Sequence, residues 1–207
     1  MTPQIQEDPG SHQHRMGQRK AAVDRRIASA TREKGLLMVH TGNGKGKSTA
    51  ALGMLVRCLG HGYPCAVVQF IKGEQATAEG VLENVAAAMG GSLSWDRCGQ
   101  GFTWEIQDHA ADVAHARAGW DLVRRHLADA GLRFLLLDEL NIVLRHGLLD
   151  TAGVLADLQA RKADLHVVLT GRGAPEALVD AADLVTEMKD IKHPFRAGIK
   201  AQAGIEF

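Results

Sequence analysis

The sequence predicts an α/β domain in which a mostly parallel sheet is covered by helices on both faces. Short apolar runs alternate along the chain with longer segments of helical periodicity, the pattern of strand–helix–strand units. A glycine-rich stretch joins the first apolar run to a helix, and a later apolar run ends in two acids. Both features are typical of domains that bind a nucleotide at the carboxyl edge of a parallel sheet.

Length and composition fit one such domain with a short extension. The chain has 207 residues, and 45% of them are hydrophobic, which is enough for a packed core. Lysine and arginine number 24, as do aspartate and glutamate, so no net charge attracts nucleic acid or an anionic membrane. No apolar run approaches the roughly 18 residues that span a bilayer. We therefore expect neither a nucleic-acid nor a membrane partner.

The cysteines and the N-terminus predict a cytoplasmic protein. Cys58, Cys65 and Cys98 are odd in number and show no C-x-x-C spacing, which favours free thiols in a reducing compartment over disulfides or a zinc site. The polar, basic N-terminus lacks the apolar core of a secretory signal. Among ten histidines only His12 and His14 are closely spaced, and a metal site there is not favoured.

Two segments precede the sheet. Residues 1–20 are polar and contain prolines and glycines, which predicts a flexible tail. Residues 21–34 carry apolar residues at helical spacing, but the stripe is thin. We expect this helix to dock on its own domain or on a partner subunit. Residues 21–207, the helix included, are predicted to form one domain.

The remaining elements follow from apolar periodicity. The predicted strands cover residues 36–39, 65–71, 92–97, 134–139, 165–170 and 184–188. The predicted helices cover residues 50–59, 79–89, 107–130 and 151–161, and a short one begins with Pro175 at its first position. The most continuous apolar runs are typical of strands buried on both faces. Residues that follow parallel strands should then share one edge of the sheet.

Residues 41–49 (TGNGKGKST) predict a phosphate-binding P-loop. Glycines let the loop aim backbone N–H groups at phosphate oxygens, and the following helix adds its positive dipole end. Lys47 can neutralise phosphate charge, and the Ser48 hydroxyl can ligate Mg²⁺. The motif G-x-x-x-x-G-K-[ST] has glycine where this chain has Thr41, with Gly42 one residue later, so we expect an unusual nucleotide pose. A turn with a chance Gly-Lys-Ser is the alternative.

Residues 134–139 (FLLLDE) form the second strong pattern. An apolar strand that ends in an acid, downstream of a P-loop, is typical of the strand whose acid lies near the Mg²⁺ of a bound nucleotide. Asp138 and Glu139 alternate in direction, so one should point at the site while the other supports it. A strand capped by solvated acids is the alternative.

Three further segments are candidates for ligand contact. Phe102 and Trp104 stand in a glycine-flanked loop, where they form either a plug on the core or an apolar wall for a large planar ligand. Arg172 follows a predicted strand, so it is either a cation at the phosphate edge or a solvated arginine. Residues 189–207 form a basic, glycine-containing tail that includes His193 and can face a ligand.

These residues alone predict binding of Mg-nucleotide but not a reaction. A P-loop NTPase or small-molecule kinase that attacks the γ-phosphate remains open. A regulator that binds ATP without turnover is a second alternative. A RecA-like nucleic-acid motor is less favoured, since no basic stripe with interleaved aromatics is present.

A set of motifs narrows these alternatives. In chain order they are TGNGKGKSTAA, VVQFIKG, GFTWE, LLDEL, LTGRG and KHPFRAGIKAQAGIEF. From about residue 20 onward the sequence resembles the ATP:corrinoid adenosyltransferases of the CobA/CobO/BtuR class. The shifted P-loop and the aromatic loop together are specific to this family, since no common P-loop kinase carries both. It implies a RecA-like P-loop domain that transfers the 5′-deoxyadenosyl group of ATP to the cobalt(I) of a corrinoid and releases triphosphate, in adenosylcobalamin biosynthesis or salvage.

The resemblance also implies roles for single residues. ATP, in a reversed orientation, would contact Thr41, Gly42, Asn43, Gly44, Lys45, Gly46, Lys47, Ser48, Thr49, Arg57 and Arg172. Mg²⁺ or Mn²⁺ would be held by Ser48 and Glu139, with Asp138 in support. Phe102 and Trp104 would wall the lower face of the corrinoid, and His193 would contact it. The residues implied in catalysis are Lys47, Phe102, Trp104 and Glu139.

The implied chemistry needs no strong base, because cobalt(I) is itself the nucleophile. Apolar side chains that displace a lower axial ligand make cobalt(II) easier to reduce, and the rest is orientation and charge stabilisation. The resemblance further implies a homodimer, an N-terminal helix that closes over the site, and a flavoprotein or flavodoxin as electron donor. Ser48 in place of the more frequent threonine, a longer segment before Gly101, and Arg196 depart from the family pattern.

Overall fold

A computed structural model describes residues 9–71, 81–88, 90–98 and 109–205 of the chain. The chain divides into two compact units, Met1–Glu33 and Lys34–Phe207, which are described separately.

The N-terminal unit contains one helix, α1 (Pro9–Ser29). The helix predicted over residues 21–34 thus begins earlier and ends earlier than expected, while residues 1–8 of the predicted flexible tail lie outside the described residues. Proline suits the first position of a helix, and the glutamine, arginine, lysine and alanine residues that follow have high helix propensity. The docking role of this helix stays a prediction.

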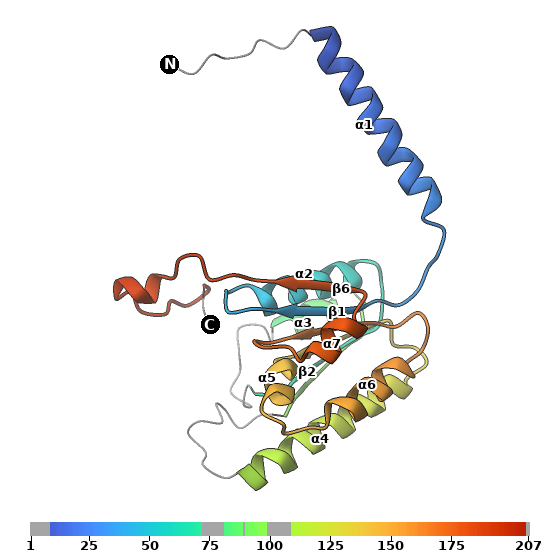
Figure 1. Ribbon diagram of the computed structural model, residues 1–207. Coiled ribbons are helices and arrows are strands. Elements are labelled where there is room, and N and C mark those ends of the chain that lie inside the picture. The colour runs from blue at the N-terminus through green and yellow to red at the C-terminus, as the bar shows by residue number, and fades with distance from the viewer. Residues whose placement is uncertain (1–8, 72–80, 89, 99–108, 206–207) are drawn as a thin grey trace. The chain divides into compact units, whose positions relative to one another are not determined.

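The second unit is built on a six-stranded sheet in which all strand pairs are parallel (Figure 1). The order across the sheet is β3-β2-β4-β5-β1-β6. The strands are β1 (Leu37–Thr41), β2 (Cys65–Gln69), β3 (Leu93–Arg97), β4 (Phe134–Asp138), β5 (His166–Thr170) and β6 (Leu184–Glu187). The predicted α/β class with a parallel P-loop sheet is confirmed, and β5 separates the P-loop strand β1 from the acidic strand β4.

Helices cover both faces of this sheet, as predicted (Figure 1). One hydrophobic core contains residues of α2 and α3, and the other contains residues of α4 to α7. The helices are α2 (Lys47–Gly60), α3 (Val81–Ala88), α4 (His109–Ala128), α5 (Leu140–Arg145), α6 (Thr151–Gln159) and α7 (Glu176–Ala181). Strands β2 and β4 are buried at every position, so they stand at the centre of both cores.

Two short helical segments were not predicted. Helix α5 follows the acids of β4 directly, and a 3₁₀ turn, η2 (Pro194–Ala197), lies in the tail that was expected to be a loop. Pro175 caps α7 instead of standing at its first position. Elements of four to six residues are too short to show a helical period.

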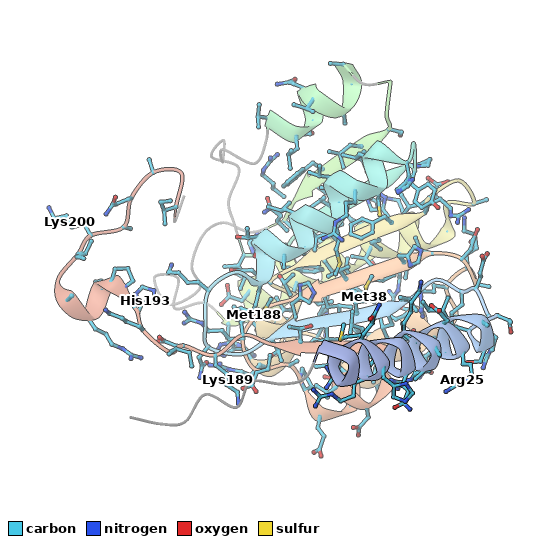
Figure 2. All side chains as sticks on the ribbon, turned by 90° about the horizontal axis from the view of Figure 1, so that it is seen from above. Arg25, Met38, Met188, Lys189, His193 and Lys200 are labelled. Carbon is cyan, nitrogen blue, oxygen red and sulfur yellow. The ribbon has the colours of Figure 1, made fainter. Side chains whose placement is uncertain are left out.

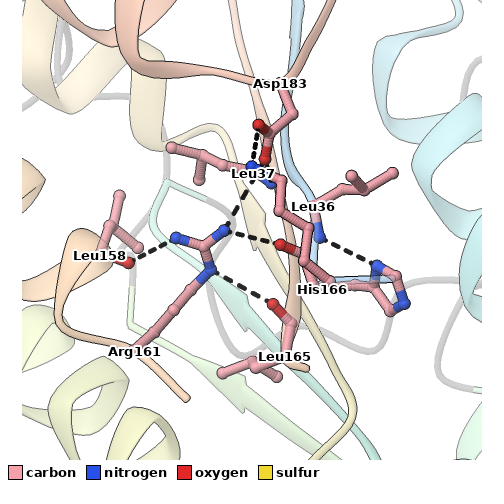
Figure 3. Close-up of polar contacts among 9 residues, drawn as sticks. Leu36, Leu37, Leu158, Arg161, Leu165, His166 and Asp183 are labelled. Atoms are coloured by element: carbon pink, nitrogen blue, oxygen red, sulfur yellow. Dashed lines mark hydrogen bonds and ion pairs between the residues drawn. The ribbon is translucent and has the colours of Figure 1, made fainter. Parts of the chain in front are cut away.

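The amino ends of β1 and β6 are joined by a polar cluster (Figure 3). Asp183 accepts hydrogen bonds from the Lys34 ammonium and from the Leu37 N–H, the latter at 2.9 Å. The Arg161 guanidinium donates to three carbonyl oxygens in this region and lies 4.0 Å from Asp183. These contacts fix the start of β1, and hence the register of the strand that leads into the P-loop.

The three cysteines all lie in the second unit. All three cysteines are free, and burial raises the pKa of Cys65 to about 12 and of Cys98 to about 11. Within the part of the chain that the structure describes, no helix is both long and apolar enough to cross a membrane.

Candidate functional site

The P-loop, the acids of β4 and the residues after β5 meet at the carboxyl edge of the sheet. The loop connects the end of β1 to the start of α2. Ser48 at the start of α2 donates a hydrogen bond to Asp138 at the end of β4, with an Oγ–Oδ1 distance of 2.7 Å. The predicted convergence of these two motifs is thereby confirmed by contact.

The loop has the conformation that a phosphate cradle needs. Gly42 and Gly46 have φ angles of 95° and 104°, in the left-handed region that favours glycine. Lys47 folds back over the loop, and its Nζ donates to the carbonyl oxygens of Gly42 at 2.9 Å and Gly44 at 2.6 Å. The ammonium group is therefore held at the mouth of the curled backbone.

Thr41 supports the loop from the side. Its hydroxyl oxygen accepts a hydrogen bond of 3.1 Å from the backbone N–H of Ala174, in the segment between β5 and α7. A glycine at this position could not make that contact. The threonine therefore links the P-loop to the segment that carries Arg172, which gives a physical reason for the departure from the usual motif.

The chain that leaves β6 also packs on the loop. The N–H of Gly44 donates to the Met188 carbonyl at 2.7 Å, and the N–H of Met188 donates to the Thr41 carbonyl at 2.9 Å. A Cβ atom at Gly44 would lie 2.6 Å from the backbone carbonyl carbon of Lys189. Figure 2 labels Met188 and Lys189 at this junction. This second role of Gly44 was not predicted, because it depends on a segment far away in the sequence.

Cations gather at the mouth of the loop. Burial lowers the pKa of Lys47, the nearby charges of Arg172 and Lys45 lower it further, and Glu139 opposes them. Lys45, Lys47 and Arg172 are close enough to interact, and such a group of cations at the loop favours an anionic ligand. An incoming polyphosphate would offset this mutual repulsion.

Asp138 is the acid that contacts the P-loop. The residue is 2% exposed, and Oδ1 accepts hydrogen bonds from the hydroxyls of Ser48 and Thr170, both at 2.7 Å. Its Oδ2 accepts from Gln69 Nε2 at 3.0 Å. The family resemblance implied the leading role for Glu139 and a supporting one for Asp138, whereas it is Asp138 that the structure joins to Ser48.

Glu139 turns away from the strand in a strained backbone conformation. Its φ of 64° is the one positive value among the non-glycine residues that the structure describes. The Glu139 N–H donates to the Thr170 hydroxyl at 2.9 Å, which holds this turn in place. Backbone strain of this kind is concentrated at functional sites. Metal binding by Glu139 stays a prediction.

Two buried polar residues hold the floor of the site. His40 Nδ1 lies 3.2 Å from the Lys47 carbonyl oxygen, and Asn141 Nδ2 donates to the carbonyl oxygens of His40 and Gly171, each at 3.1 Å. These contacts tie the ends of β1 and β5 to the start of α5. In the sequence, the only indication of this role was that His40 is a polar residue near the end of an otherwise apolar strand.

Some predicted site residues are not gathered here. Arg57 lies in the last turn of α2, ten residues or about 15 Å along the helix from Lys47. His193 caps η2, where its Nδ1 accepts from the Phe195 N–H at 3.2 Å. Phe102 and Trp104 lie outside the described residues. Ligand contacts by these four residues stay predictions.

The donor atoms at the loop fit a hard divalent cation. Ser48 and Asp138 offer a hydroxyl and a carboxylate, the oxygen ligands that Mg²⁺ prefers. Within the described ranges, no group of three or more His, Cys, Asp or Glu side chains could hold a metal ion. A hydroxyl and one carboxylate leave the other positions of an octahedral Mg²⁺ to phosphate oxygens and water.

Comparison with known proteins identifies close relatives. The model of the family described as ATP:corrinoid adenosyltransferase BtuR/CobO/CobP matches residues 33–207. A corrinoid adenosyltransferase of Pseudomonas aeruginosa is 52% identical over 196 residues, which are 95% of each chain. One of Sinorhizobium sp is 50% identical over 98% of this chain and 94% of its own. The corrinoid adenosyltransferase CobA of Salmonella typhimurium is 41% identical over 95% of this chain and 97% of its own.

Proposed function

Because the chain belongs to the ATP:corrinoid adenosyltransferase family, we propose that it transfers the 5′-deoxyadenosyl group of ATP to the cobalt(I) of a corrinoid. The reaction would serve adenosylcobalamin biosynthesis or salvage. The observation that carries the proposal is the family match over residues 33–207, joined to a formed P-loop with cations at its mouth.

The bond changes explain what the protein must supply. The electron pair of cobalt(I) attacks C5′ of the ribose, a Co–C bond forms, and the C5′–O bond breaks with its electrons passing to triphosphate. The nucleophile comes with the substrate, so no side chain needs to act as base. Lys45, Lys47 and Arg172 would offset the charge that develops on the leaving group. The loop would hold the phosphates so that C5′ faces the corrinoid.

We further propose that ATP binds with Mg²⁺ or Mn²⁺ on the P-loop side. When bound, the ion would screen the charge of the phosphates. Ser48 and Asp138 would hold it, with Glu139 as a third candidate. Because the Ser48 proton is donated to Asp138, the lone pairs of the hydroxyl oxygen stay available to a cation.

The corrinoid side of the reaction rests on the family resemblance. Phe102 and Trp104 would wall the lower face of the corrinoid, and His193 would contact it from the C-terminal segment. We propose a homodimer, with α1 closing over a site, and a flavoprotein or flavodoxin that delivers the electron. The cytoplasm is the proposed compartment, because the three thiols are free.

A product assay tests the function. The protein is mixed without oxygen with Mg-ATP and cobalamin that has been reduced to cobalt(I). Adenosyl transfer predicts a light-sensitive alkyl-cobalamin spectrum together with intact triphosphate. An unchanged corrinoid with ADP and phosphate would instead assign the P-loop to conventional γ-phosphate chemistry. Tight ATP binding without any product would point to a regulator.

A further inference from the structure

A chain of buried hydrogen bonds crosses three strands beneath the P-loop. Trp95 Nε1 on β3 donates to Gln69 Oε1 on β2 at 2.8 Å, and Gln69 Nε2 donates to Asp138 Oδ2 on β4 at 3.0 Å. Asp138 Oδ1 then accepts from Ser48 Oγ at 2.7 Å. Gln69 stands opposite Asp138 in the sheet register, which brings the two side chains together.

The donor and acceptor groups of these side chains allow only one direction of hydrogen-bond donation, from Trp95 through Gln69 to Asp138. An indole N–H can only donate, an ionised carboxylate can only accept, and a glutamine amide has one group of each kind. Trp95 therefore fixes the Gln69 amide with its nitrogen toward Asp138. Gln69 is 2% exposed and Trp95 is 9% exposed, so bulk water cannot take over either bond.

The chain limits how the Asp138 carboxylate can rotate. The Gln69 bond holds Oδ2 on the β2 side, which leaves Oδ1 facing the hydroxyls of Ser48 and Thr170. The Ser48 proton then points at Asp138, and the oxygen lone pairs point elsewhere. Without the Gln69 amide, Oδ2 would lose its hydrogen bond from β2, and the orientation of the carboxylate would depend on its bonds to Thr170 and Ser48.

We propose that Gln69 and Trp95 are positioning residues that act through Asp138 to orient the Ser48 hydroxyl toward the metal ion of bound ATP. The inference rests on the proposed use of a divalent cation. It predicts that Gln69 influences how strongly Mg²⁺ assists ATP binding and has little influence on binding of metal-free ATP.

The test compares ATP affinity with excess Mg²⁺ and with a chelator, measured by titration calorimetry. Gln69→Leu keeps the volume of the side chain and removes its amide. We expect the Mg²⁺-dependent gain in affinity to fall by roughly five- to tenfold, which is part of the full cost of a hydrogen bond to a charged group, because Asp138 keeps its bonds from Ser48 and Thr170. The affinity for metal-free ATP should change by less than about twofold. A larger change would signal a general loss of structure in the variant.

Val67→Ala is the matched control. Val67 lies on the same face of β2, is fully buried, and takes no part in the chain. Its loss creates a cavity without touching the Asp138 carboxylate. Trp95→Phe, which keeps an aromatic ring but removes the N–H, provides a second variant in case Gln69→Leu fails to fold. We expect Trp95→Phe to lower the gain by roughly two- to threefold, through the Gln69 amide.

The outcomes separate this inference from the proposed function. If Mg²⁺ assists the wild type and both chain variants equally, the positioning role is overturned while adenosyl transfer stands. An equal loss in Val67→Ala would also overturn it, because packing would then explain the effect. A wild type that binds ATP equally with and without Mg²⁺ would overturn the metal assignment and this inference together.

Discussion

The Lys47 side chain stabilises the curled P-loop and is also the residue proposed to contact phosphate. In the structure its ammonium group bonds to two loop carbonyls, and its pKa is lowered by burial and by the neighbouring cations Arg172 and Lys45. A bound phosphate would raise that pKa, because an anion favours the charged form of lysine. Nucleotide binding and the charge state of Lys47 are therefore coupled.

Replacement of Lys47 should weaken ATP binding strongly. We expect Lys47→Ala to weaken ATP affinity by about tenfold to a hundredfold, as loss of a charge-assisted phosphate contact predicts. Calorimetric titration with ATP measures this, and thermal unfolding shows whether the variant is folded. An unchanged ATP affinity would contradict the phosphate role of the loop.

Trp104 should matter at the corrinoid and not at the nucleotide. We expect Trp104→Ala to keep its ATP affinity but to lose most turnover when the corrinoid starts as cobalt(II). The same variant should lose far less when the corrinoid is already cobalt(I), because the ring is proposed to ease the reduction. Wild-type activity from cobalt(II) with a weak reductant would refute the role.

At the scale of elements, the contact between the P-loop and the segment after β6 predicts a specific sensitivity. A Cβ at Gly44 would meet the Lys189 backbone, which cannot simply move aside. We expect Gly44→Ala to lower the free energy of unfolding by about 1–3 kcal/mol, as measured in urea. Gly53→Ala is the control: nothing lies within 4 Å of its Cβ, and alanine within a helix should stabilise by about 0.5–1 kcal/mol. A neutral Gly44→Ala would mean that the two segments do not pack as described.

The cluster at the amino ends of β1 and β6 predicts a dependence of stability on pH. The Lys34 hydrogen bond, with that of the Leu37 N–H, lowers the pKa of Asp183 below its ordinary value. Its contribution to stability is therefore present above the unfolded pKa of about 3.9 and is lost as pH falls through the folded value. We expect Asp183→Asn to be less stable than the wild type near neutral pH, with the difference shrinking below about pH 4. Urea unfolding at several pH values measures this, and a difference that is constant with pH would contradict it.

For the whole molecule, the sequence was sufficient to predict the parallel sheet and the meeting of the P-loop with the acidic strand. Apolar runs such as residues 134–137 are long enough to indicate strands, and parallel topology then brings their ends together. Periodicity could not show which of Asp138 and Glu139 faces Ser48, because that depends on a single backbone turn with positive φ. It also could not show contacts between distant segments, such as Met188 with the loop.

The hydrogen-bond partners of Gln69 and Trp95 could not be predicted from the sequence. Gln69 stands in a run that is otherwise apolar, and its amide finds both of its partners on neighbouring strands. Only the order β3-β2-β4 brings these three side chains into line. Strand order is a property of the whole sheet, so the chain of hydrogen bonds could not be inferred from local sequence.

Adenosyl transfer requires that the C5′–O bond of ATP breaks, and an isotope experiment shows which bond of ATP is cleaved. ATP labelled with ¹⁸O at the bridging 5′ oxygen is incubated with the protein, Mg²⁺ and cobalt(I) cobalamin without oxygen. The products are then analysed by mass spectrometry. Adenosyl transfer predicts intact triphosphate that carries the whole label, and an adenosylcobalamin with none. Label retained in ADP, together with unlabelled phosphate, would contradict adenosyl transfer and assign the protein to γ-phosphate chemistry.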